Sequence, residues 1–199
     1  MLHHKLIKLA KNLMCIIGLI AISPFLLFAA LVLMLEDGLP IFFKQDRIGQ
    51  HLKIFKIIKI RTLKNSTPQI STHELQAKHR LNAGSLIRKI KLDEFPQLFN
   101  VIKGELNLVG PRPGLVTQEE LLKFRAEREI FQIKPGITGL AQVMGYDMSN
   151  PKKLSEIDEI YVLNQSFKVD ILIFLATFIS FPKKYLSQYF KIEDLSSIK

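Results

Sequence analysis

The sequence has only one cysteine, Cys15, so no disulfide can form within the chain. Cys15 lies in an apolar run, and a chain without disulfides suits a reducing compartment, so we expect the polar part in the cytoplasm. The five histidines are scattered, and no Cys/His cluster has the spacing of a zinc site. Internal repeats and low-complexity tracts are also absent from the sequence. These absences argue against a disulfide-stapled domain, a zinc module and a repeat protein.

The charge balance is strongly basic. Lysine and arginine number 28 against 18 acids, a formal net charge of +10 in 199 residues. Such a charge predicts a polyanionic partner, which could be nucleic acid, an anionic membrane surface or a phosphorylated substrate. No aromatic residues interleave a basic stripe, which argues against a membrane-tethered module for nucleic acid. The length is sufficient for one domain with a real core.

An uncharged run of 23 residues from Leu13 to Leu35 makes this a membrane protein. As a straight helix it would measure about 35 Å, enough to cross a hydrocarbon core. Ser23-Pro24 lies at its centre, where Pro24 removes the hydrogen bond to the Ile20 carbonyl and Ser23 can offer its hydroxyl instead. The kinked helix could span, or it could turn back and leave by the side it entered. Basic residues on both flanks favour the second path.

After this run the pattern turns to short elements. The segments "PIFFKQDRIG" and "LKIFKIIKIRTL" flank Gly49-Gln50-His51 and predict a β-hairpin. Residues 74–91 are typical of a helix with a break at Gly84-Ser85. A second helix is expected from Asp93 to Lys103. The whole pattern predicts a mostly helical α+β protein.

The C-terminal half is expected to contain further helices and a loop. Thr117 and Glu120 form a possible capping box for a helix through about Gln132. "KPGITGLAQVMG" is typical of a glycine-punctuated loop, and Asn150-Pro151 opens another helix with Asp158 and Tyr161 on one face. The last apolar run, residues 171–181, is too short to span a membrane. It fits a helix lying in the membrane interface or a buried core helix.

The adjacent acids Asp93-Glu94 allow two interpretations. Asp93 followed by Pro96 resembles a helix N-cap, and capping needs no second acid. Alternatively, neighbouring residues on a helix point in different directions, so the pair could reach a phosphorus atom and a metal ion. Cationic residues gather near the pair in sequence, namely Lys56, Lys59, Arg61, Arg88, Lys89 and Arg112. Together with the acids they would form a site for a diphosphate carried on a divalent metal.

The order of these segments resembles the small monotopic phosphoglycosyl transferases, a group of bacterial sugar transferases. The resemblance rests on the run with Ser23-Pro24 and on the motifs "PIFFKQDRIG", "FKIIKIRT", "LDEFPQLFNVIKGELNLVGPRP", "KPGITGLAQV" and "DEIYV". It covers roughly Lys8 to Ile173.

This resemblance implies an enzyme that moves a sugar phosphate from a UDP-sugar to undecaprenyl phosphate and releases UMP. Asp93 would be the nucleophile that forms a covalent phosphosugar intermediate, and Glu94 would help to hold Mg²⁺. Further site residues implied in this way are the phosphate contacts Lys59, Arg88 and Arg112, and a supporting acid, Asp158.

The resemblance also implies a location and an organisation. Residues 1–37 would form a re-entrant helix-break-helix, broken at Ser23 and Pro24, and residues 38–199 a catalytic domain with interfacial helices. The protein would be monotopic in the inner membrane, with its catalytic domain facing the cytoplasm on anionic lipids. Later glycosyltransferases of the pathway are possible partners, and nucleic acid is not.

Four positions depart from the family's usual residues. Leu140 stands where tryptophan is usual and Tyr146 where arginine is usual. Lys91 replaces a small hydroxyl residue and Leu52 a glycine. The acids themselves match, so the reaction class follows from the resemblance and the choice of sugar does not. A UDP-sugar pyrophosphatase and an inactive scaffold that recruits glycosyltransferases remain the alternatives.

Overall fold

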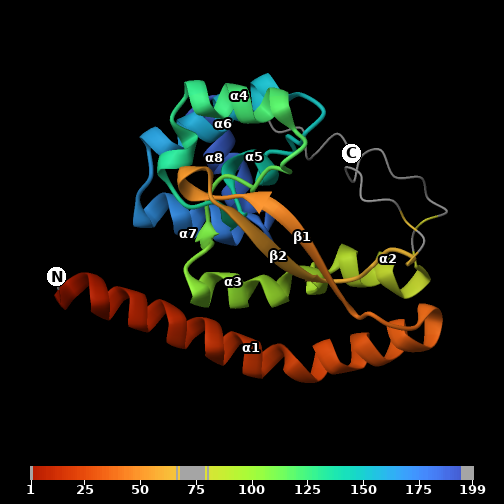
Figure 1. Cartoon of the computed structure of the whole chain (residues 1–199). Coiled ribbons are helices and arrows are strands. Elements are labelled where there is room, and N and C mark those ends of the chain that lie inside the picture. Colours follow the sequence, from red (N-terminus) through yellow and green to blue (C-terminus); the bar gives the residue numbers. More distant parts are fainter. Residues whose placement is uncertain (1, 66, 68–78, 80, 194–199) are drawn as a thin grey trace. The chain divides into compact units, whose positions relative to one another are not determined.

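The computed structural model describes residues 2–65, 67, 79 and 81–193. The chain forms two compact units. Unit 1 comprises Met1–Gln45 and Lys56–Gly104, and unit 2 comprises Asp46–Phe55 and Glu105–Lys199. The described residues are mostly helical and include a small β-hairpin, which confirms the predicted α+β class (Figure 1).

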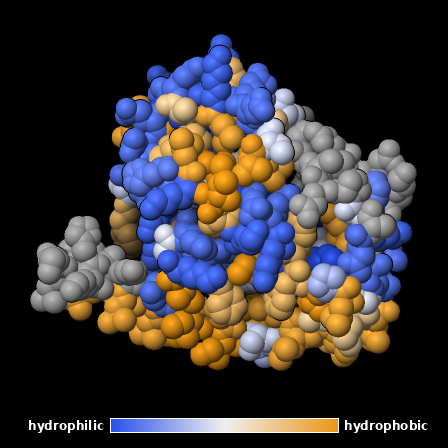
Figure 2. Space-filling view, viewed as in Figure 1, coloured by the Kyte–Doolittle hydropathy of each residue, from blue (hydrophilic) through white to orange (hydrophobic). Residues whose placement is uncertain are grey.

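The longest element is the helix α1, Leu2–Asp37, which continues through Pro24. Ser23 Oγ donates to the Ile20 carbonyl at 2.8 Å, so the hydroxyl satisfies the acceptor that Pro24 leaves unbonded, as predicted. Figure 1 shows that α1 is bent. The part from Leu9 to Asp37 is long and apolar enough to cross a membrane, and most of it is exposed. Figure 2 shows hydrophobic side chains along this helix. The re-entrant path itself stays a prediction.

The β-hairpin prediction is confirmed. Strand β1, Phe42–Ile48, pairs with β2, Ile54–Ile60. The turn contains a short 3-10 helix, η1, Gln50–Leu52. His51 and Leu52 both have a positive φ, of 53° and 59°. This left-handed conformation explains why glycine suits position 52 better than leucine.

The helix α2, Asn82–Lys89, corrects the expected break at Gly84-Ser85. The helix runs through both residues. Gly84 is needed for another reason: a Cβ atom there would lie 2.4 Å from the Thr62 carbonyl oxygen. Glycine therefore allows α2 to pack on the backbone that follows β2. Most of the predicted helical segment before Asn82 lies outside the described residues.

Residues 92–103 form two elements and not the single helix that was predicted. A 3-10 helix, η4, Leu92–Gln97, leads directly into α3, Leu98–Lys103. The N-cap position belongs to Lys91, which has a left-handed backbone, and no side chain caps this end. Asp93 lies inside η4, so the interpretation of Asp93 as the N-cap is wrong. Gly104 ends α3 in a left-handed conformation, as expected for a C-cap.

Unit 2 contains a parallel pair of short strands, β3, Asn107–Val109, and β4, Gly136–Thr138. The second strand and the helix α5, Leu140–Val143, correct the prediction that "KPGITGLAQVMG" is only a loop. Gly136 and Gly139 allow this segment to approach Gly110, because a Cβ atom at Gly136 would lie 2.1 Å from the Gly110 nitrogen.

Helices surround this strand pair in unit 2. Helix α4, Glu119–Glu127, is shorter than predicted and is followed by a 3-10 helix, η5, Ile130–Gln132. The predicted capping box at Thr117 is wrong, since Gln118 occupies the N-cap position and no side chain caps the helix. Asn150 does cap α6, Pro151–Leu163, by accepting from the Lys153 N–H group.

The last apolar run is divided between two helices, α7, Phe167–Ala176, and α8, Ser180–Phe190. Val169, Ile173 and Ala176 of α7 belong to the core of unit 2, together with Leu186 of α8. Other large side chains of this region are exposed, namely Phe167, Phe174, Phe178, Phe181 and Tyr189. One face of this region therefore lies in the core and the other is exposed, and an interfacial position for the exposed face stays a prediction.

Candidate active site

Lys59 of β2 and Glu94 of η4 form an ion pair in unit 1. The Lys59 Nζ atom donates to Glu94 Oε1 at 2.7 Å. The two side chains are 13% and 19% exposed, so the pair is accessible only in part. The structure thus brings together two predicted site residues that lie 35 positions apart in the sequence.

Arg88 of α2 contacts the segment that follows β2. Its Nη2 atom donates to Thr62 Oγ1 at 2.9 Å, and Thr62 lies two residues after the end of β2 at Ile60. The close approach of α2 at Gly84 makes this contact possible. Lys59 and Arg88 are therefore both anchored on β2 and the residues that follow it.

Asp93 lies beside Glu94 in η4 and is 5% exposed. It is the one buried acid among the described residues of unit 1. The η4 segment contacts α1 as well as α2 and α3, so the candidate membrane helix packs against the segment that carries the acids. A carboxylate that is shielded from water, and that lies near the strand carrying Lys59 and the helix carrying Arg88, is suited to attack on phosphorus.

Sequence reasoning missed Asn100 in α3, which fixes β2. Asn100 is completely buried. Its Nδ2 atom donates to the Lys56 carbonyl at 2.8 Å, and its Oδ1 atom accepts from the Ile58 N–H group at 3.2 Å. These bonds hold the strand on either side of Ile57 and so orient Lys59. A polar residue between the apolar Phe99 and Val101 was the available signal.

Arg112 and Asp158, the other two predicted site residues, belong to unit 2. Arg125 of α4 joins them: its Nη2 atom donates to Asp158 Oδ2 at 2.5 Å, and its Nη1 atom donates to the Arg112 carbonyl at 2.7 Å. Burial raises the pKa of Asp158, and the Arg125 guanidinium opposes that rise. Sequence reasoning also missed Arg125, since the residues around it do not indicate that its partner, Asp158, lies 33 residues away.

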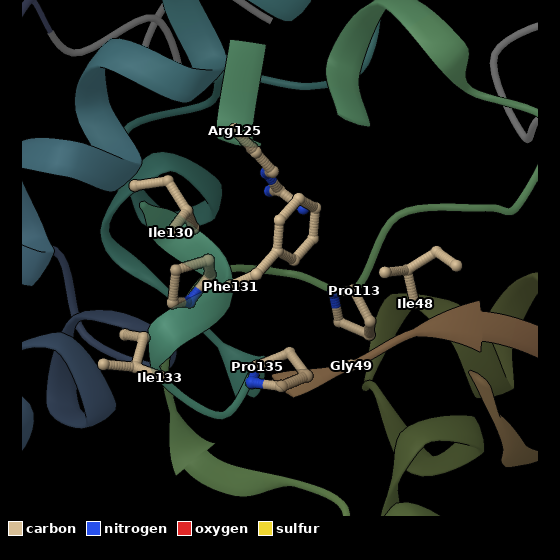
Figure 3. A pocket seen from close by; sticks show the side chains of 9 residues that line it. Ile48, Gly49, Pro113, Arg125, Ile130, Phe131, Ile133 and Pro135 are labelled. Carbon is tan, nitrogen blue, oxygen red and sulfur yellow. The ribbon is translucent and has the colours of Figure 1, made fainter. Parts of the chain in front are cut away.

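Figure 3 shows the side chain of Arg125 pointing from α4 toward Phe131, in a hollow that Pro113 and Pro135 also line. The hollow is otherwise lined by apolar residues and one glycine, namely Ile48, Gly49, Pro111, Ile130 and Ile133.

The acids fit a metal site in which substrate phosphates supply some of the ligands better than a site made of protein ligands alone. Among the described residues no three histidine, cysteine or acidic side chains form a ligand group. Mg²⁺ commonly binds through one or two carboxylates together with substrate phosphates and water. Glu94, with Asp93 next to it, offers a donor set of this kind.

A comparison with protein families identifies the family of the chain. The family model described as "Bacterial sugar transferase" matches residues 3–184, most of the chain. The chain belongs to the bacterial sugar transferase family. Membership makes it a sugar transferase, and the matched residues include both acids and the residues that position them.

Three known proteins are similar in sequence to this chain. The uncharacterized sugar transferase EpsL of Bacillus subtilis is 41% identical over 158 residues, covering 78% of this chain and 76% of EpsL. A UDP-N-acetylgalactosamine-undecaprenyl-phosphate N-acetylgalactosaminephosphotransferase of Aeromonas hydrophila is 35% identical, covering 81% of this chain and 40% of that protein. The UDP-glucose:undecaprenyl-phosphate glucose-1-phosphate transferase of Escherichia coli is 33% identical, covering 91% of this chain and 41% of that protein.

Proposed function

We propose that this protein transfers a sugar 1-phosphate from a UDP-sugar to undecaprenyl phosphate and releases UMP, in polysaccharide synthesis. The observation that carries the proposal is the Lys59–Glu94 pair next to the buried Asp93 in a bacterial sugar transferase. The names of two relatives support the acceptor and the class of donor. Because those names specify different sugars, they leave the sugar open.

In the proposed mechanism, an Asp93 carboxylate oxygen attacks the phosphorus atom that carries the sugar. The bond from this phosphorus to the UMP oxygen breaks, and UMP leaves with the electron pair. Asp93 then holds the sugar phosphate as an acyl phosphate. A phosphate oxygen of undecaprenyl phosphate attacks the same phosphorus, which restores the Asp93 carboxylate and forms the diphosphate-linked product.

Cationic groups would stabilise the charge that develops on the diphosphate. Lys59 and Arg88 lie in unit 1 with the acids, and the resemblance implies the same phosphate-binding role for Arg112. Glu94 would hold Mg²⁺ against the phosphate oxygens, and the ion would supply further charge neutralisation. Lys59 keeps Glu94 in place through the 2.7 Å bond.

We further propose that residues 1–37 form a re-entrant membrane helix and that residues 38–199 form a catalytic domain on the cytoplasmic face of the inner membrane. The Ser23-Pro24 bend and the basic flanks support the first part. The exposed Phe174, Phe178 and Phe181, with Lys183 and Lys184 next to them, support interfacial positions for α7 and α8.

The test is an assay of UMP release by the full chain in lipid, with a panel of UDP-sugars and with or without undecaprenyl phosphate. The proposal expects continuous turnover only when acceptor is present, and at most one equivalent of UMP per enzyme without it. Continuous UMP release without acceptor would identify a pyrophosphatase. Absence of UMP release with every sugar would favour the scaffold.

A further inference from the structure

Four consecutive carbonyls of the loop at Arg112 each accept a hydrogen bond from elsewhere in unit 2. The donors come from β4, from α4 and from the end of β1. The bonds are Gly136 N–H to Pro111 at 3.0 Å, Arg125 Nη1 to Arg112 at 2.7 Å, Arg47 Nη1 to Pro113 at 2.9 Å, and Ile48 N–H to Gly114 at 3.0 Å.

This arrangement fixes the main chain on both sides of Arg112. Pro111 and Pro113 have restricted φ angles and no N–H group, so their carbonyls are the groups that can anchor the loop. The carbonyl of Arg112 itself accepts from the Arg125 side chain. The direction in which the Arg112 side chain leaves the loop therefore depends on the place of the Arg125 guanidinium.

Asp158 in turn holds Arg125. The Nε and Nη2 atoms of Arg125 donate to Asp158 Oδ2 at 3.0 and 2.5 Å, and both residues are 2% exposed. A buried guanidinium needs such a partner, because removing one member of a buried pair leaves an uncompensated charge. At this exposure Asp158 is poorly placed to contact a substrate directly.

We propose that Arg125 and Asp158 are positioning residues that act through Arg112. Asp158 orients the Arg125 guanidinium, Arg125 holds the Arg112 carbonyl, and the Arg112 guanidinium is thereby aimed at a phosphate of the UDP-sugar. This inference rests on the proposed function, which makes Arg112 a phosphate contact. The competing account is that the pair only stabilises unit 2.

The test removes the hydrogen bonds from Arg125 to Asp158 and to the Arg112 carbonyl while the fold is kept. Replacement of a buried ion pair by apolar residues of similar volume is often neutral or stabilising. The double variant Arg125→Met/Asp158→Leu should therefore unfold at a temperature close to that of the native chain. Its KM for the UDP-sugar should rise about tenfold, as for loss of one charge-assisted contact, with a smaller change in kcat.

A control pair joins the C-cap of α4 to α6. Arg128, the residue directly after α4, pairs with Glu159 of α6 at 3.4 Å, away from the loop carbonyls. Arg128→Met/Glu159→Leu makes the same chemical change and should leave KM unchanged. Arg125→Lys, which keeps the charge but not the forked geometry, should give an intermediate KM.

Combining these changes with Arg112→Ala distinguishes a positioning role from a purely stabilising role of the Arg125–Asp158 pair. Arg112→Ala should raise KM about as much as the apolar double variant, and combining all three changes should add little. Unchanged KM in a folded Arg125→Met/Asp158→Leu protein would overturn the inference, as would effects that multiply with Arg112→Ala.

UDP binding by calorimetry provides the same comparison without turnover. A native chain that binds UDP but releases no UMP would contradict the proposed function alone, and the binding constants would still decide the inference. A native chain that neither binds nor turns over would contradict both.

Discussion

The ammonium of Lys59 lies 2.7 Å from a carboxylate oxygen of Glu94, which joins strand β2 to the segment that carries both acids. Each side chain is less than one-fifth exposed, at 13% and 19%. An ion pair with so little exposure is screened less by water than a surface pair. Glu94 is therefore held in one place before any substrate arrives.

Replacing Glu94 by glutamine should lower UMP release by about 10²-fold, the scale of losing one electrostatic stabiliser. The amide oxygen can still accept from Lys59, so the fold is kept while the negative charge is lost. EDTA should silence the native enzyme, and added Mg²⁺ should restore it. Glu119→Gln, an exposed acid of α4, is the control and should be fully active. Unchanged Mg²⁺ dependence in Glu94→Gln would show that Glu94 has another task.

Asp93→Asn should abolish both turnover and the covalent phosphosugar adduct, since an amide is a poor nucleophile. The adduct is measured by labelling with a UDP-sugar that carries a radioactive sugar. Asp147→Asn is a suitable control, because Asp147 is exposed and accepts from Ser149, which asparagine can also do. A folded Asp93→Asn protein that still labels would remove Asp93 from the role of nucleophile.

Cysteines introduced at Lys5 and at Lys44 should be labelled from the same, cytoplasmic, side of the membrane. The existing Cys15 is first replaced by serine. Changing Ser23 and Pro24 to leucine should favour a straight, spanning helix, because the missing hydrogen bond and the ring clash are both removed. In that variant the two cysteines should label from opposite sides. Labelling from opposite sides in the unmodified helix would contradict the re-entrant path.

Leu52→Gly should stabilise the protein by roughly 0.5–1 kcal/mol, since Leu52 has a φ of 59° and is largely exposed. The gain is smaller than the full cost of the left-handed conformation, because glycine also has more freedom in the unfolded chain. Chemical denaturation measures the difference. Lys53→Gly is the matched control: Lys53 has a φ of −69°, so glycine there should destabilise. Equal effects at the two positions would show that the backbone conformation is not the cause.

Asp170→Asn should flatten the dependence of stability on pH. Burial raises the pKa of Asp170, although the hydrogen bond from Tyr161 opposes the rise. A raised pKa means that the stability present below the ordinary value of 3.8 is lost as pH rises through the folded value. Thermal unfolding of the native chain and the variant should therefore differ most in slope just above about pH 4.

Tyr161→Phe provides the complementary change for Asp170. It removes the hydrogen bond that lowers the pKa of Asp170, so the loss of stability should move to higher pH. Identical slopes in all three proteins would mean that Asp170 titrates alike in the folded and unfolded chains.

The sequence was most informative where one local signal decides the structure. The hydrogen bond from Ser23 to the Ile20 carbonyl, the hairpin around Gly49 and the helix start at Asn150-Pro151 were all predicted correctly. Signals with two possible causes failed: Gly84 was interpreted as a helix break, whereas it permits a close backbone contact with Thr62. Thr117 had the spacing of a cap and is not one.

The candidate site was predictable only in part for the same reason. The resemblance to a family selected Asp93, Glu94, Lys59 and Arg88. In the structure Lys59 lies in β2, and Arg88 bonds to Thr62 in the segment that follows β2. Asn100 and Arg125 were missed because their partners are backbone groups and side chains far along the chain. Composition and periodicity carry no information about such pairs.

The two hydrogen bonds of Asn100 have a consequence for the alignment of the hairpin. The side-chain amide of Asn100 accepts from the N–H group of residue 58 and donates to the carbonyl of residue 56 in β2. Both bonds can form in only one alignment of the strand with α3. Because side chains alternate across a strand, a slip by a single residue would turn Lys59 to the opposite face and bring Ile58 or Ile60 toward Glu94. The buried amide of Asn100 thus fixes the strand register, which decides whether an ammonium or a hydrocarbon side chain faces Glu94.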